Sequence, residues 1–198
     1  MSYRIEEKIP LSLFEGMSLI DSLKAKGLKV LFPKRKINSF YYDTPLLTMF
    51  RDSEEGLLPR KKIRIRNYPE SSNNESSLEK KISSVEGRYK VTEVLDALAA
   101  KKISKNGYFD NTYGHLIPLV QVSYDREYYE YNGLRITLDS DIIYQHVIEK
   151  TNQYKEKMSV VELKAGPHWA PDAIIALIQE NRRRFSKYCN AVRHLNLS

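Results

Sequence analysis

Strands whose polar positions are mostly cationic are the feature that most constrains the fold of this chain. Residues 61–68 read KKIRIRNY, in which charged and apolar residues alternate. Because successive side chains of a β-strand point to opposite faces, Lys62, Arg64 and Arg66 share one face and Ile63 and Ile65 share the other. An ordinary solvated strand face mixes the two signs of charge. This face therefore predicts a sheet surface that meets an anion.

The same alternation recurs in four later segments: SLEKKI (77–82), VSYDREYY (122–129), LRITLD (134–139) and VVELK (160–164). One cationic strand face alone is most often a solvated surface, but its repetition across several strands favours a shared charged interior in a sheet that curls and closes. Cations brought that close repel one another strongly in a partly dry cavity. A polyphosphate chain or a nucleoside triphosphate would supply the compensating charge.

Composition agrees with an anionic partner. The net charge is +7 and the isoelectric point is near 9.3, which leaves nucleic acid, phosphorylated metabolites and anionic lipid open. The single cysteine, Cys189, excludes an intramolecular disulfide and a thiolate zinc cluster. A charged N-terminus and the lack of an apolar run of about 18 residues predict neither a signal peptide nor a membrane span. We expect a cytoplasmic protein.

The pattern along the chain predicts one α+β domain over residues 1–198. Expected strands are residues 3–9, 36–44, 61–68, 77–83, 86–91, 119–131, 134–142 and 159–166, and expected helices are residues 11–27, 92–102 and 170–185. Thr92 is expected near the N-cap of the second helix. The pair Asn132-Gly133 predicts a hairpin turn. Residues 45–59 are expected to be a polar connection and residues 101–118 to be irregular.

The order of these segments resembles the VTC domain, the polyphosphate polymerase branch of the triphosphate tunnel metalloenzymes. The resemblance is carried by YRIEEK, INSFYYDT, KKIRIRNY, LEKK, VSYDREYY, LRITLDSDI, VVELK and RRFSKYCNAV, from about residue 3 to about residue 195. KIRIR, SYDRE and RFSKYC are its most specific pieces. The resemblance implies an antiparallel β-barrel tunnel with helices packed outside.

The resemblance also implies a set of site residues. The implied catalytic residues are Arg64, Arg66, Lys81, Arg126 and Lys187. The implied substrate-binding residues are Lys8, Lys62, Arg88, Lys90, Tyr124, Arg135 and Arg184, with Arg88 and Lys90 competing for one role. Glu162, and with it Glu79, is the expected ligand of Mn²⁺ or Mg²⁺, although each carboxylate alone is more often a salt-bridge partner. His115, His146, His168 and His194 lack ligand spacing and are expected to be structural or surface residues.

The implied activity is transfer of the γ-phosphate of ATP onto a phosphate or polyphosphate chain. Related hydrolases carry an N-terminal Glu-x-Glu-x-Lys, whereas this chain has Arg4, Glu6 and Lys8, which favours the polymerase branch. A tripolyphosphate or nucleoside triphosphate hydrolase and a non-catalytic polyphosphate-binding module stay open as alternatives. A nucleic-acid binder is a weaker alternative, since no signature of a nucleic-acid-binding fold accompanies the fourteen tyrosines. Expected partners are ATP and polyphosphate, with a separate membrane partner as a further possibility.

Overall fold

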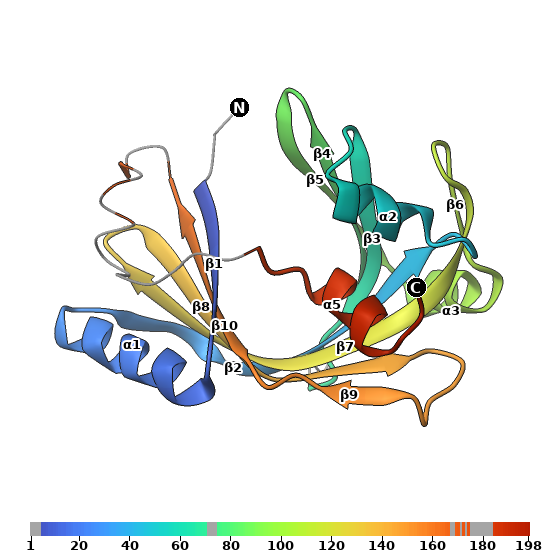
Figure 1. The fold of residues 1–198 in the computed structure, drawn as a ribbon. Coiled ribbons are helices and arrows are strands. Elements are labelled where there is room, and N and C mark those ends of the chain that lie inside the picture. The colour runs from blue at the N-terminus through green and yellow to red at the C-terminus, as the bar shows by residue number, and fades with distance from the viewer. Residues whose placement is uncertain (1–4, 71–74, 167–168, 171, 173, 175–183) are drawn as a thin grey trace. The chain divides into compact units, whose positions relative to one another are not determined.

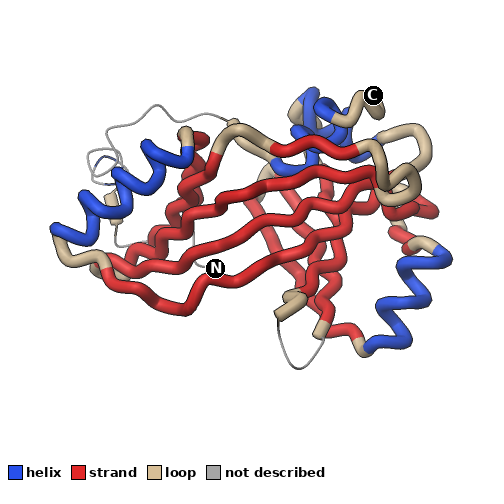
Figure 2. The backbone as a smooth tube through the Cα atoms, turned by 90° about the horizontal axis from the view of Figure 1, so that it is seen from below, coloured by secondary structure: helices blue, strands red, loops and turns tan. Residues whose placement is uncertain are grey.

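Strands dominate the chain in the computed structural model, which describes residues 5–70, 75–166, 169–170, 172, 174 and 184–198 (Figure 1, Figure 2). The strands are β1 (Ile5–Leu11), β2 (Lys29–Asp43), β3 (Arg60–Asn67), β4 (Ser76–Ser84), β5 (Gly87–Leu95), β6 (Tyr108–Asp110), β7 (Gly114–Tyr131), β8 (Leu134–His146), β9 (Gln153–Lys155) and β10 (Ser159–Ala165). The helices are α1 (Leu13–Ala25), α2 (Thr48–Glu55), α3 (Ala97–Asn106) and α5 (Lys187–His194).

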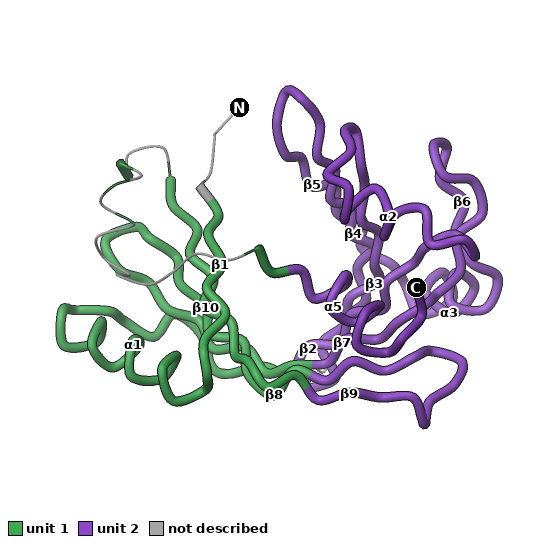
Figure 3. Tube along the Cα trace, viewed as in Figure 1, with its two compact units in different colours: residues 1–35, 124–142, 156–185 green, residues 36–123, 143–155, 186–198 purple. Residues whose placement is uncertain are grey.

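The strands pair in the order β1-β10-β8-β7-β2-β3-β4-β5, with β6 beside β7 and β9 beside β8. Each pair with a described register is antiparallel. The chain divides into two compact units (Figure 3). The first unit comprises residues 1–35, 124–142 and 156–185, and the second comprises residues 36–123, 143–155 and 186–198.

The first unit has its own core between α1 and one face of the strands β1, β10 and β8. Ile20 and Leu23 of α1 are buried with Val161 and Leu163 of β10. The helix approaches the sheet closely at Gly16, where a Cβ atom would lie only 2.8 Å from the Ser159 hydroxyl oxygen. Because the odd-numbered side chains of β10 enter this core, Glu162 and Lys164 lie on the opposite face of the strand.

The second unit has a separate core on one face of β3. Ile63 and Ile65 are buried there with Tyr42 of β2, Leu78 of β4 and Met49 of α2. The alternation of β3 then places Lys62, Arg64 and Arg66 on its other face. Arg64 and Arg66 are buried as well, so both faces of this strand are covered. The sequence pattern predicted the two faces and a charged interior, and the burial of Arg64 and Arg66 agrees with both.

Two helix predictions are wrong in detail. Residues 48–55, expected to be part of a polar connection, form α2, whose first turn donates backbone hydrogen bonds to the side chain of Asp43. The helix expected at residues 92–102 begins at Ala97, with Asp96 as its N-cap, and Thr92 instead lies in β5. This helix continues to Asn106, and β6 and the start of β7 follow in the region expected to be irregular. The β-branched residues Val91, Thr92 and Val94 favour the strand.

Other predictions are confirmed. α1 begins at a capping box of Ser12 and Glu15, and Gly27 follows it with a positive φ. Asn132 and Gly133 both have positive φ in the turn between β7 and β8, as a type I′ hairpin requires. The helix expected at residues 170–185 and the residue Arg4 lie largely or wholly outside the described residues. The expectation of a single domain stays a prediction.

The described helices are all too short or too polar to cross a membrane.

Candidate functional site

Cationic side chains gather on one face of β3, β4 and β5 in the second unit. In the described registers Lys62 is paired with Lys81, and Lys81 with Lys90, so three lysines form one row across three strands. Neighbouring strands lie about 4.8 Å apart. Ammonium groups held at that spacing would repel one another by about 3 kcal/mol per pair at an effective dielectric constant of about 20. The row is therefore suited to a bound polyanion.

The same face carries further cations in the rows on either side. Arg64 is paired with Glu79, and Arg60 is paired with Ser83, which is paired with Arg88. Among the paired residues of these three strands, seven side chains on this face are cationic: Arg60, Lys62, Arg64, Arg66, Lys81, Arg88 and Lys90. Glu79 is the one carboxylate among them. The structure thus brings together most of the second-unit residues predicted to bind phosphate.

Glu79 holds three of these cations by ion pairs. Its carboxylate accepts hydrogen bonds from Arg64 Nε and Nη2 at 2.7 and 2.5 Å, from Lys90 Nζ at 2.7 Å and from Arg66 Nη1 at 3.5 Å. Burial alone would raise the pKa of this carboxyl, but the charges of Arg64 and Arg66 outweigh burial and hold the pKa at about 2. The predicted metal role of Glu79 stays a prediction, and these contacts favour the salt-bridge alternative.

The remaining predicted cations of the second unit lie around this face. Lys62 Nζ donates to the hydroxyl oxygen of Ser186 at 2.9 Å, and Ser186 is the N-cap residue of α5. Lys187, the first residue of α5, therefore follows directly on a residue that contacts the cationic face. Arg88 and Lys90 are both exposed, and Lys90 Nζ contacts Glu79. Which of these two contacts phosphate stays open.

A second charged cluster lies in the first unit and centres on Arg126. Its guanidinium donates from Nε and Nη2 to the two oxygens of Asp139 at 2.5 and 2.7 Å, and Nη2 lies 3.4 Å from Glu162 Oε2. Lys164 Nζ lies 3.0 Å from the other oxygen of Glu162. Burial alone would lower the pKa of Arg126, but the Asp139 carboxylate more than offsets it and raises the pKa. The arginine stays charged.

Three other predicted residues of the first unit, Lys8, Tyr124 and Arg135, lie on this face or beside the cluster. Lys8 is paired in register with Glu162 and forms an ion pair with Glu6 at 3.1 Å. The Arg126 guanidinium lies 5.3 Å from the ring centre of Tyr124. Arg135 is exposed and lies over the ring of Tyr128. Arg184 is also exposed.

The metal role of Glu162 stays a prediction, since its carboxylate forms ion pairs with Arg126 and Lys164. Thr137, in register with Glu162 on the same face, has a buried hydroxyl oxygen with no hydrogen-bond partner among the residues that the structure describes. A metal held by protein alone would need more ligands, and no group of three or more candidate ligands occurs within the described ranges. Mg²⁺, however, commonly takes one or two carboxylates and completes its shell with water and substrate phosphates. Glu162 suits that mode.

Sequence reasoning missed five residues that support these clusters. Asp139 was placed on the correct face of its strand, but its role as the bidentate partner of Arg126 was not foreseen. Tyr41 and Asp43 alternate along β2, and Ser186 and Tyr188 lie at the start of α5. The alternation in YYD was an available signal for the first pair. The contacts that α5 makes depend on distant residues and left no signal in the local pattern.

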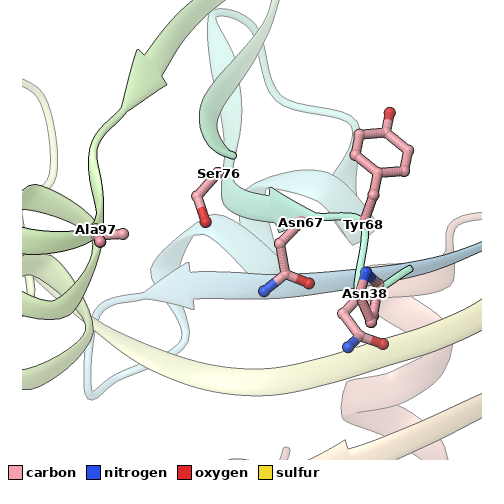
Figure 4. Close-up of a pocket in the computed structure, with 7 residues that line it drawn as sticks. Asn38, Asn67, Tyr68, Ser76 and Ala97 are labelled. Carbon is pink, nitrogen blue, oxygen red and sulfur yellow. The ribbon is translucent and has the colours of Figure 1, made fainter. Parts of the chain in front are cut away.

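A pocket of about 330 Å³ lies apart from the cationic face of the second unit (Figure 4). It is lined by Asn38, Asn67, Tyr68, Pro69, Ser76, Ala97 and Ala100. Asn67 follows Arg66 on β3 and so points to the opposite side of the strand. None of the residues described as lining it is charged. The pocket therefore lacks the cationic side chains that a phosphate site needs.

Comparisons with known proteins identify the family. The sequence profile of the VTC domain matches residues 5–196, nearly the whole chain. A comparison with curated proteins finds no matching sequence.

Solved structures show the same fold at low sequence identity. A candidate adenylate cyclase from Bacillus halodurans has a TM-score of 0.64 at 14% identity, over 92% of this chain and 93% of that one. A protein from Pyrococcus horikoshii OT3 has a TM-score of 0.62 at 15% identity, over 96% and 99% of the two chains. A candidate adenylate cyclase from Vibrio parahaemolyticus has a TM-score of 0.56 at 14% identity, over 96% and 98%. Together with the profile match, they confirm the predicted fold class, the α+β triphosphate tunnel fold.

Proposed function

Because the chain belongs to the VTC domain family, we propose that it is a phosphotransferase that moves the γ-phosphate of ATP onto a phosphate or polyphosphate chain. The family and the fold support an enzyme that binds triphosphates. The observation that carries the proposal is the face of β3, β4 and β5, where seven cations accompany one carboxylate in the paired residues. Such an excess of positive charge is stabilised by a ligand that carries several negative charges.

The buried arginines are suited to hold that ligand. Arg64 has its guanidinium fixed by Glu79 on one side and by the hydroxyl of Tyr41, at 2.8 Å, on the other. A donor group that is already oriented needs little reorganisation when charge develops on a phosphate oxygen, which is how electrostatic catalysis acts. Arg66 contacts the same carboxylate through Nη1 at 3.5 Å. We assign Arg64, Arg66 and Lys81 to phosphate binding in the second unit.

The first unit contributes a cluster of mixed charge. Arg126 is held by Asp139 and is assigned to phosphate binding, and Glu162 is assigned to the metal. A bound Mn²⁺ or Mg²⁺ would neutralise charge on the phosphate oxygens during transfer. The protein needs no covalent nucleophile, because phosphoryl transfer depends mainly on positioning and on charge stabilisation. Lys8 and Arg184 of the first unit are also assigned to phosphate binding, and so, in the second unit, is Lys187.

The test is incubation of the protein with ATP and Mn²⁺, followed by measurement of ADP and of long polyphosphate on a stained gel. We expect ADP and long polyphosphate to increase together. Release of phosphate without polymer would assign the chain to the hydrolases, and binding of polyphosphate without ADP would make it a binding module.

A pair of variants distinguishes the loss of Arg64 from a general loss of positive charge. Arg64→Ala leaves Glu79 with two of its cations, so we expect a folded protein without turnover. Arg51→Ala removes an exposed arginine of α2 and should leave turnover unchanged. Equal turnover in the two variants would refute the assignment of Arg64.

A further inference from the structure

Asp43, at the end of β2, joins two helices of the second unit. It is fully buried, and its carboxylate accepts backbone hydrogen bonds from Met49 and Phe50 in α2, both at 2.9 Å. The hydroxyl of Tyr188 in α5 donates to the same carboxylate. One side chain thus accepts from two helices that are far apart in sequence. A buried carboxylate with several donors is a strong and directional attachment point.

Tyr188 connects the Asp43 carboxylate to residues near the cationic face. Its ring stacks on that of Tyr41, with centroids 5.3 Å apart and planes at 24°, and it meets Phe50 edge-on at 6.5 Å. Tyr188 is 2% exposed, so the ring is enclosed and not merely in contact. Stacked and edge-on aromatic pairs stabilise a structure beyond the area that they bury.

Tyr41 in turn contacts Arg64, which is assigned to phosphate binding. It is paired in register with Arg64, accepts a hydrogen bond from Arg64 Nη1 at 2.8 Å and has the guanidinium 5.6 Å from its ring centre. Ser186, two residues before Tyr188, accepts from Lys62 Nζ. Two cations of the face are therefore connected to the position of α5, one through Tyr41 and one through Ser186.

We propose that Asp43, Tyr188 and Tyr41 are positioning residues, which fix α5 against the cationic face and so orient Arg64, Lys62 and Lys187 for phosphate. The inference rests on the proposed function only for the identity of the anion. None of the three needs to contact the substrate, since each acts through a cation. Removing the hydroxyl of Tyr188 loosens the start of α5 while leaving the cations themselves in place.

The test compares two tyrosine hydroxyls that each donate to an aspartate. Tyr188→Phe removes the bond to Asp43, and the matched control Tyr113→Phe removes a bond of 2.6 Å to Asp52 of α2. Tripolyphosphate affinity is measured by calorimetry, and the accessibility of Lys62 and Lys187 by acetylation and mass spectrometry. We expect Tyr188→Phe to raise the tripolyphosphate Kd about tenfold and to increase labelling of both lysines, and Tyr113→Phe to do neither.

Each outcome is decisive. Unchanged labelling in Tyr188→Phe would show that the hydroxyl does not hold α5, and the inference would be wrong. Increased labelling with an unchanged Kd would reduce the three residues to a purely structural role, which also overturns it. Failure of the wild-type protein to bind tripolyphosphate would refute the proposed function, and the labelling comparison would still decide whether the hydroxyl positions the lysines.

Discussion

Replacing Glu79 with glutamine should destabilise the protein in a way that a polyanion can reverse. Glu79 is the carboxylate that pairs with Arg64, Arg66 and Lys90, and its side chain is 4% exposed. The glutamine keeps the shape of the side chain but removes its charge. Two arginines that are each 8% exposed then lose their counter-charge. A buried charge left without its partner is strongly destabilising.

The pKa of Glu79 gives the expected magnitude. The carboxyl falls from an ordinary value of 4.5 to about 2 in the folded protein. One pKa unit corresponds to about 1.4 kcal/mol, so the folded state stabilises the ionised carboxylate by about 3 kcal/mol. Because the folded pKa is the lower one, this stability is present above pH 4.5 and is lost as the pH falls towards 2. Glu79→Gln should therefore lose about 3 kcal/mol of unfolding free energy at pH 7 and lack this acid dependence.

Urea unfolding at pH 7 measures the loss, with and without tripolyphosphate. Without ligand we expect the midpoint of Glu79→Gln to fall well below that of the wild type. Tripolyphosphate should restore more stability to the variant than to the wild type, because it replaces the missing negative charge. Glu93→Gln, at an exposed position of β5 on the other face, is the control and should change little. A loss below about 1 kcal/mol in Glu79→Gln would refute the argument.

Three further variants test other parts of the site. Lys81→Ala should raise the tripolyphosphate Kd, measured by calorimetry, about tenfold. Its control is Lys80→Ala, because Lys80 lies on the opposite face of β4, over the ring of Tyr108, and should leave the Kd unchanged. Equal effects of the two variants would contradict the assignment of Lys81 to the cationic face. Asp139→Ala should lower the free energy of unfolding, measured with urea, by about 3–5 kcal/mol. The Arg126 guanidinium then stays buried without its bidentate partner. A loss near zero would contradict that pairing. Glu162→Gln should raise the Mn²⁺ concentration for half-maximal turnover at least about tenfold, and an unchanged metal titration would remove Glu162 from the metal.

The faces of the strands could be predicted from the sequence, because alternation alone determines which side chains share a face. KKIRIRNY has Lys62, Arg64 and Arg66 where the alternation places them, opposite Ile63 and Ile65. The row of Lys62, Lys81 and Lys90 could not be predicted in the same way. A row across strands depends on the register of two pairings, and a shift by one residue would turn one of the lysines to the other face.

The short helices and the buried carboxylates could not be predicted from local sequence patterns. α2 and α5 have eight residues each, too few to be stable alone, so tertiary contacts decide whether they form. Asp43 and Asp139 are fully buried, which is rare for an aspartate without partners. Their partners lie at distant sequence positions, and nothing in the neighbouring residues distinguishes them from exposed aspartates.

The bond between Asp43 and Tyr188 can form only late in synthesis of the chain. Tyr188 is translated 145 residues after Asp43, and Lys62, Arg64 and Arg66 emerge long before it. While the chain is still being made, the strands that carry these cations lack the contact of Lys62 with Ser186 and the stacking of Tyr41 on Tyr188. Docking of α5 is therefore a late step, and the contacts of Tyr41 and Lys62 with this helix form only after it.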